Sequence, residues 1–555
     1  MKRTNIDTVN NVNCCEGCSR QTCLRSLTYP LYVFGVTLFL PLFLYVTVIP
    51  QSWTANIYWL GFCFILFTNI IIIVEALFNI ISATYHYCRK KRHYVWNAQL
   101  GRYQLMYETD YTNLAKANSN ILITPYLINE AIEKQRKQDE DNVYSVEIAD
   151  STVPELNDRK IDDLIIKTRD PSLAIIVPAY LVNEKDIIYD TLRHMGTINY
   201  SNNANVNIIL TFNSPPFNEK EMVLARIDDL QETYKKCGKT LTIVEVPKSR
   251  SKAENINYVI DLIEEGKIDK PDFVAIYDAD HLPEQNSIIR AVHLMQKKNA
   301  DVLQGRCVVY NNKSFLGSII ATEFDMIYII HHKGGELVRG MGFFGGSNGV
   351  WRYHALKTVR MDHTMLTEDI DSSMRAIINH GFKFIYSNSV VSYELCPTTL
   401  ISLIKQRIRW SQGWFQVTLR HTWPMLKCNY LTCRNKFTFF IMLLYREIFY
   451  YPASQVIPLF ITSVIRNTYE QNEYLLLSTI FSILILPLEL IVVNLNKRLD
   501  SEHITPSDYK DVSIWQQLIF IMLAPAYDYL KFFIVVVSHI LELCGNKVWR
   551  VTSRT

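Results

Sequence analysis

The sequence predicts an α/β domain with a mostly parallel sheet, set between two groups of membrane helices. Hydrophobic residues make up 49% of the 555 residues and the mean hydropathy is slightly positive, which is high for a protein whose whole surface meets water. Long apolar runs gather near both ends of the chain. Between them, short apolar strands alternate with helical stretches, which is typical of a parallel sheet.

Two apolar runs near the N-terminus, at 27–49 and 57–83, each supply about the 20 residues needed to cross a hydrocarbon core. The first run is too long for a signal peptide and has no small-residue cleavage pattern after it. Basic residues flank the pair on both sides, and such residues favour the cytoplasmic face of a membrane. We therefore expect a transmembrane hairpin followed by a cytosolic domain in a multi-pass membrane protein.

Three further apolar runs follow the central domain, at 437–465, 474–493 and 515–543. If each run crosses the bilayer, the chain makes five crossings and its basic tail at 544–555 lies outside, against the charge rule. A re-entrant, interfacial or split run would remove the conflict. Five and six crossings both stay open.

The N-terminal tail, residues 1–26, contains Cys14, Cys15, Cys18 and Cys23, four of the 12 cysteines. A reducing cytosol disfavours disulfides, and an adjacent pair without a nearby histidine is a poor zinc site. Palmitoylation beside the membrane and free thiols are the interpretations left. We expect 89–171 to be a cytosolic linker region, because it includes a mixed charge run at 134–142. The net charge of +3 excludes the strongly basic footprint of a nucleic-acid-binding protein.

The central domain is expected to span 172–436, because its strand pattern begins at residue 172. Four segments read as buried strands: LAIIVPAY, NVNIILTF, LTIVEV and FVAIYDAD. In a parallel sheet of this kind, ligands bind at the carboxyl ends of the strands. The residues that follow these strands are therefore the candidate binding residues.

Asp278, Asp280 and His281 follow the fourth of these strands. Two carboxylates one residue apart, with an imidazole beside them, have the donors to surround one divalent cation. Such an ion would bridge a nucleotide diphosphate and stabilise it as a leaving group. A plain solvated acidic turn is the alternative interpretation.

Glu368 and Asp369 follow Thr367 at the start of a predicted helix, whose apolar face is formed by Ile370, Met374, Ile377 and Ile378. A carboxylate there would act as a general base that deprotonates a sugar hydroxyl. The alternative is ordinary helix capping, in which threonine caps the first turn and acidic residues interact favourably with the helix dipole.

A third motif lies on a predicted helix, where Gln406, Arg409, Trp410, Gly413 and Trp414 share one face. An amide, a guanidinium and two indoles would stack on sugar rings and neutralise phosphate. An interfacial helix with an anchoring aromatic and a snorkelling arginine has the same composition. The two interpretations are compatible.

Taken in order, these motifs resemble the membrane-embedded family 2 glycosyltransferases, which include cellulose, chitin, hyaluronan and poly-N-acetylglucosamine synthases. The resemblance rests on VPAYLVNE (177–184), SKAENIN (251–257), DADH (278–281), FGGSNGVWR (344–352), TED (367–369) and QRIRW (406–410), and covers about 172–419. It implies a GT-A fold, a nucleotide-sugar donor, Mg²⁺ or Mn²⁺, and inversion at the anomeric carbon. It also implies a growing polysaccharide that passes through a channel of membrane helices.

The resemblance assigns roles by motif position. Nucleotide-sugar binding falls to Pro178, Tyr180, Glu184, Asn213, Lys252, Asp278 and Arg409. Metal binding falls to Asp278, Asp280 and His281, and catalysis to Asp369 as the base, with Glu368 beside it. The acceptor would contact Phe344, Ser347, Asn348, Gln406 and Trp410.

One position departs from the family pattern, because the second strand ends in Asn213 where relatives usually carry an acidic residue. An amide still offers a donor and an acceptor to a nucleotide. DADH followed by TED, with FGGSN between them, resembles the cellulose-synthase-like enzymes more than the hyaluronan synthases, so we expect UDP-glucose and a β-glucan. UDP-N-acetylglucosamine, alone or with UDP-glucuronate, and GDP-mannose stay open. A non-processive transferase acting on a lipid phosphate and a membrane transporter with an inactive domain are the competing functions.

Overall fold

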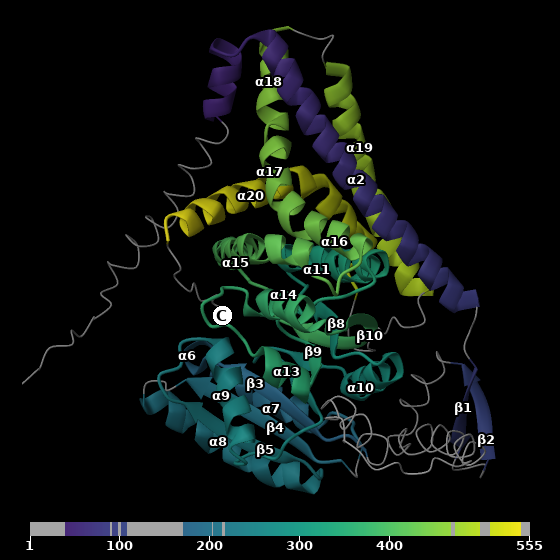
Figure 1. The fold of residues 1–555 in the computed structure, drawn as a ribbon, viewed down its shortest axis with the longest axis vertical. Coiled ribbons are helices and arrows are strands. Elements are labelled where there is room, and N and C mark those ends of the chain that lie inside the picture. Colours follow the sequence, from purple (N-terminus) through teal and green to yellow (C-terminus); the bar gives the residue numbers. More distant parts are fainter. Residues whose placement is uncertain are drawn as a thin grey trace, which may run out of the picture.

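The computed structural model describes residues 39–88, 92–97, 102–107, 170–201, 204–213, 217–467, 472–499 and 511–545. The cysteine-rich tail, most of the first apolar run, the greater part of the 89–171 region and the C-terminal tail lie outside these residues. The described chain has a sheet domain at one end and long helices at the other (Figure 1).

The main sheet has eight strands in the order β5-β4-β3-β6-β9-β8-β10-β7. The strands are β3 (Leu173–Ala179), β4 (Val206–Asn213), β5 (Thr240–Val246), β6 (Phe273–Ile276), β7 (Leu282–Pro283), β8 (Val302–Val309), β9 (Gly349–Arg352) and β10 (Phe384–Glu394). β5, β4, β3 and β6 are mutually parallel, as the sequence predicts. The other half is mixed, because β9 runs antiparallel to β6 and β8, and β7 runs antiparallel to β10.

Helices cover both faces of the parallel half, which explains why its strands read as continuous apolar runs. Successive side chains of β3 enter different cores: Ile176 packs in the cluster that includes Ile256 of α9 (Lys252–Glu264), and Ile175 in the cluster that includes Leu192 of α7 (Ile188–Gly196). The remaining helices around the sheet are α6 (Leu181–Glu184), α8 (Phe217–Lys236), α10 (Ser287–Lys298), α13 (Tyr353–Val359) and α14 (Glu368–His380).

A layer of helices separates the sheet from the long apolar helices (Figure 1). It consists of α11 (Phe315–Asp325), the π-helix η1 (Met326–Gly334), α12 (Gly335–Arg339), α15 (Leu400–Lys427) and α16 (Cys433–Phe440). The apolar helices beyond it are α2 (Gln51–Cys88), α17 (Arg446–Ser454), α18 (Val456–Ile465), α19 (Asn472–Leu499) and α20 (Ile514–Leu543), with η2 (Ile441–Tyr445) joining α16 to α17. A separate antiparallel pair is formed by β1 (Arg92–Asn97) and β2 (Arg102–Tyr107).

Two stretches of described helix are long and apolar enough to cross a bilayer, Gln51–Tyr85 and Cys433–Ile465. A third is possible by length and composition if the two parts of α20, bent by 56°, form one span. The run expected at 474–493 lies within α19. The bend in α20 is the kind of split run that the sequence left open, and the number of crossings stays a prediction.

The π-helix η1 ties the sheet domain to α2. His331 Nδ1 lies 3.0 Å from Glu75 Oε2, and Asn79 donates a hydrogen bond to the Ile329 carbonyl. At Gly334 an added Cβ would lie 2.6 Å from the Glu75 carbonyl oxygen, so only glycine fits at this approach of two backbones.

Candidate active site

A cavity of about 1240 Å³ lies where the strand ends of the sheet meet the layer of helices, and it continues between the apolar helices. Most of the residues predicted from the motifs line it: Pro178, Tyr180, Glu184, Asn213, Lys252, Asp278, Asp280, His281, Ser347, Glu368, Asp369, Gln406, Arg409 and Trp410. Phe67 of α2, Tyr445 of η2 and Phe449 of α17 line the same cavity. Motifs far apart in the chain therefore share one space with the candidate membrane spans.

Lys252 is the first residue of α9, where Ser251 caps the helix by accepting a hydrogen bond from the Glu254 amide. Its ammonium donates to Asp278 Oδ1 and to the Gly346 carbonyl, both at 2.5 Å. Burial alone would lower the pKa of Lys252, but Asp278 and Glu368 outweigh burial and raise it. The side chain therefore stays cationic and is available to a phosphate.

Asp278, Asp280 and His281 converge just beyond β6, with one donor atom of each within 4.8 Å of the others. Asp278 is fixed by its amide, which donates to Ser347 Oγ at 3.0 Å. His281 Nδ1 lies 3.2 Å from Ser392 Oγ. Two carboxylates and an imidazole at this separation fit one divalent cation.

Asp369 lies in the first turn of α14. Burial, and then the neighbouring Glu368 carboxylate, raise the pKa of Asp369 to about 7. Gly346 passes beside it with φ +96°, and a Cβ there would lie 2.8 Å from Asp369 Oδ2. A carboxyl group that titrates near neutral pH has the proton affinity suited to general base catalysis.

Thr367 precedes α14 but makes no side-chain capping bond, so ordinary helix capping does not explain its hydroxyl. It packs instead against α15, where an added Cβ on Gly413 would lie 2.4 Å from Thr367 Cγ2. Gly413, three residues after the QRIRW segment, therefore allows this helix to touch the segment that holds Asp369.

Arg407 lies over the Trp410 ring, with 4.5 Å between its guanidinium carbon and the ring centroid. Its guanidinium donates to Glu323 Oε2 at 2.7 Å, and Lys531 Nζ lies 3.2 Å from Glu323 Oε1. Burial alone would raise the pKa of Glu323, but Arg407 and Lys531 lower it to about 2. An ionised carboxylate from α11 thus holds the arginine that supports the indole.

Several buried polar atoms of cavity-lining residues have no hydrogen-bond partner among the described residues, and they include Asn213 Oδ1, Thr367 Oγ1 and Gln406 Oε1. Buried polar atoms are nearly always hydrogen-bonded in folded proteins. Their shared position around one cavity indicates that a polar ligand completes them.

Two predicted acceptor residues do not line the cavity. Phe344 is 1% exposed and packs edge-on against Trp351, with 5.6 Å between ring centroids. The Asn348 amide donates to the carbonyls of Arg306 and Val390. Their side chains support the FGGSN loop from inside, and the neighbouring Phe343 is the aromatic that lines the cavity.

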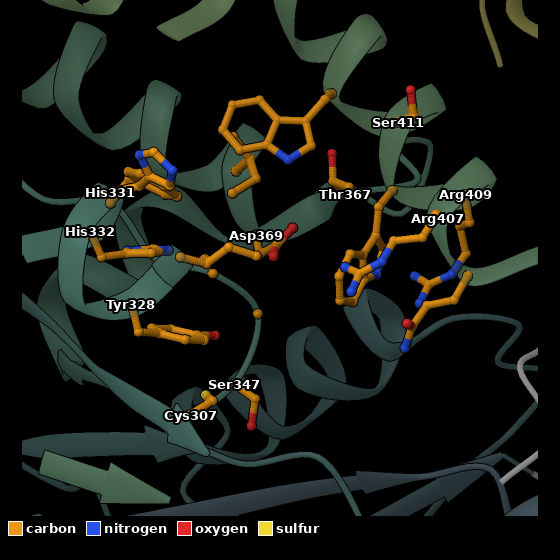
Figure 2. A pocket seen from close by; sticks show the side chains of 18 of the residues that line it. Cys307, Tyr328, His331, His332, Ser347, Thr367, Asp369, Arg407, Arg409 and Ser411 are labelled. Atoms are coloured by element: carbon orange, nitrogen blue, oxygen red, sulfur yellow. The ribbon is translucent and has the colours of Figure 1, made fainter. Parts of the chain in front are cut away.

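The residues of η1 are not among those that the sequence motifs predict. Tyr328 and His332 stack with 4.9 Å between ring centroids at 14°, and both line the cavity. Figure 2 shows them on the side opposite Arg407 and Arg409, with Asp369 between. The signal was present, because Glu323, Asp325 and the histidines interrupt an otherwise apolar run at 315–334, and buried ionisable groups need partners.

Comparison with known proteins supports the motif analysis. Residues 273–492 match the model of glycosyl transferase family group 2. This part of the chain is a family 2 glycosyltransferase domain. The match begins at β6 and includes DADH, TED and QRIRW. Four residues that the motifs assign to nucleotide-sugar binding precede it, namely Tyr180, Glu184, Asn213 and Lys252.

Curated relatives of the glycosyltransferase domain carry glycosyltransferase names. A probable glucomannan 4-beta-mannosyltransferase 7 of Oryza sativa subsp. japonica is 32% identical over 146 residues, covering 26% of this chain and 25% of that protein. A poly-beta-1,6-N-acetyl-D-glucosamine synthase of Staphylococcus epidermidis is 25% identical over 252 residues, covering 45% of this chain and 57% of that protein. The aligned part of this chain thus spans from a quarter to somewhat over half of these relatives.

Among solved structures, the mannosyltransferase PcManGT from Pyrobaculum calidifontis, in complex with GDP-Man and Mn²⁺, superposes with a TM-score of 0.42 at 16% identity. The superposition covers 60% of this chain and 86% of that one. The sheet of this chain is mixed, and the cavity lies at its strand ends.

Proposed function

We propose that this protein is an inverting, metal-dependent glycosyltransferase that extends a polysaccharide on the cytosolic side of a membrane and passes the chain between its own helices. One observation carries the proposal: a single cavity is lined by the DADH, TED and QRIRW residues and by α2, η2 and α17. One cavity would then hold the donor site, the catalytic base and the path by which the product leaves.

The donor side of the cavity supplies charge for a nucleotide diphosphate. Lys252 offers its ammonium beside Asp278, and Arg409 lies near enough to Glu368 to lower that carboxyl's pKa, although burial raises it on balance. A divalent cation, Mg²⁺ or Mn²⁺, held by Asp278, Asp280 and His281 would neutralise the diphosphate when bound. These groups would stabilise the leaving group without reorganising during the reaction.

The acceptor side supplies the base and a surface for sugar rings. Asp369 would take the proton of the acceptor hydroxyl, which attacks the anomeric carbon on the face opposite the departing nucleotide diphosphate. Trp410 would stack on the acceptor sugar. Gln406 Oε1, which has no partner among the described residues, would accept a hydrogen bond from a sugar hydroxyl.

The relatives' names bear on the donor sugar. They act on mannosyl and N-acetylglucosaminyl substrates by name, so they favour GDP-mannose or UDP-N-acetylglucosamine over the UDP-glucose expected from the sequence. Asn213 at the end of β4 is compatible with guanine or uracil in the nucleotide, because its amide can donate or accept a hydrogen bond.

A panel of labelled donors tests the proposal. Purified full-length protein is incubated with GDP-mannose, UDP-N-acetylglucosamine or UDP-glucose and Mn²⁺, and the product is sized and digested with linkage-specific glycosidases. We expect a β-linked polymer from one donor. No transfer from any donor would overturn the enzyme assignment and favour a transporter with an inactive domain. A lipid-linked monosaccharide alone would overturn processivity.

A further inference from the structure

A second group of metal-ligating side chains lies beside the DADH site. One donor atom each of His281, Cys307 and Glu394 lies within 4.8 Å of the other two. His281 and Cys307 are each 2% exposed, and all three residues line the cavity. In Figure 2 Cys307 lies next to Ser347 and below Tyr328.

The sheet brings these residues together from three segments. Cys307 on β8 is in register with Ser392 on β10, two residues before Glu394 at the end of that strand. Ser392 Oγ lies 3.2 Å from His281 Nδ1, and His281 Nε2 lies 2.9 Å from Glu394 Oε2. Because Ser392 engages Nδ1, the ring presents Nε2 to Glu394 and Cys307.

The donor set distinguishes this group from the DADH site. Mg²⁺ and Mn²⁺ prefer oxygen ligands, whereas a thiolate selects softer cations such as Zn²⁺. Zinc bound by three protein ligands from sulfur, nitrogen and oxygen, with a fourth position open, is a common arrangement. At bond lengths of about 2.0–2.3 Å its ligand atoms lie about 3.5 Å apart, so small side-chain movements would close the group around an ion.

We propose that His281, Cys307 and Glu394 form an inhibitory site for a thiophilic divalent cation such as Zn²⁺. His281 belongs to both groups, and one nitrogen lone pair cannot serve two ions. A cation held by Nε2, Cys307 and Glu394 therefore withdraws His281 from Asp278 and Asp280.

Binding of the cation by the Cys307 thiolate releases the thiol proton to water.

Co²⁺ and Cd²⁺ are the probes for this site. Full-length protein is titrated with Co²⁺ in excess Mg²⁺, and the thiolate charge-transfer absorption is recorded. We expect Cys307→Ser to remove part of this absorption. Cys396→Ser is the matched control, because Cys396 is also buried and lies two residues beyond Glu394 but is outside the group. Equal absorption in wild type and Cys307→Ser would overturn the site.

Inhibition by Cd²⁺ at saturating Mn²⁺ tests the consequence, which rests on the proposed function. We expect Cys307→Ser to keep its activity without Cd²⁺ and to need at least about tenfold more Cd²⁺ for half-inhibition, because even indirect ligand partners are typically worth about 10- to 100-fold in affinity. Glu394→Gln should shift the same way if Cys307→Ser fails to fold. Unchanged inhibition would overturn the inhibitory role, while the Co²⁺ absorption reports on the site even if no donor is turned over.

Discussion

The two sides of the cavity are built differently. The half that we propose binds the donor, residues 170–283, is built on parallel strands, and the segments after those strands carry Lys252 and the DADH residues. The acceptor half, residues 315–427, is made of α11, η1, α14 and α15, and its polar residues are fixed by contacts across helices, such as Glu323 with Arg407. A donor site can therefore be read from strand ends, whereas the acceptor site depends on how helices pack.

The halves also differ in their contacts with the long apolar helices. In the acceptor half, η1 contacts Glu75 of α2 and Glu323 contacts both Tyr527 and Lys531 of α20. Movement of α2 or α20 would therefore displace the acceptor side of the cavity before the donor side. We therefore expect that donor binding and polymer extension can be disturbed separately. Three substitutions and a pH profile test this expectation.

The largest effect is expected for Asp369→Asn, which removes the base while preserving shape. Transfer should fall by about 10²–10⁴-fold, while donor affinity changes little because Lys252 and the aspartates remain. Transfer rate and nucleotide-sugar binding by calorimetry check this. Asp229→Asn, on the exposed side of α8, is the control. Loss of donor binding in Asp369→Asn would show that this residue binds the donor.

Gly413→Ala should come next. The new Cβ would lie 2.4 Å from Thr367 Cγ2, so α15 must move away from the segment that holds Asp369. A misplacement of about 1 Å can cost about 10²-fold in rate. Polymer synthesis should drop by this order while donor binding persists, and the exposed Lys405→Ala on the same helix should be silent. Normal synthesis by Gly413→Ala would show that the contact is not needed.

The pH profile should show a milder effect. Because the pKa of Asp369 is raised to about 7 and the base must be deprotonated, the rate should fall about tenfold for each pH unit below about 7 and level off above it. Rates measured from pH 5 to 9 at saturating donor check this. The residual activity of Asp369→Asn should lack this limb, and a wild-type profile flat down to pH 5 would rule out a base with this pKa.

Ser347→Ala should have the smallest effect, and on the donor half. It removes the hydroxyl that accepts from the Asp278 amide, a hydrogen bond worth about 0.5–1.5 kcal/mol. The Mn²⁺ concentration for half-maximal activity should rise about two- to tenfold, with the maximal rate nearly unchanged. A fall in maximal rate at saturating Mn²⁺ would instead indicate that Ser347 acts on the acceptor.

Most of the donor half could be predicted from local pattern. The continuous apolar runs place β3, β4, β5 and β6 correctly, because strands buried on both faces need apolar residues throughout. The helix after Thr367 and the long helix of the QRIRW segment were also predicted. Once these strands and helices are predicted, the residues that follow a strand or begin a helix are expected to face the cavity.

The sequence by itself determined the class of the domain, the identity of its base and cation ligands as candidates, and the apolar ends of the chain. Tertiary structure alone decided that the sheet is mixed, that Phe344 and Asn348 face inward, and that Cys307 meets His281. The physical reason is that these features depend on pairs of residues that are distant in the chain. They include strand direction, clusters across strands, and close helix contacts such as Gly413 with Thr367. The local periodicity of apolar residues in the sequence carries no information about such pairs.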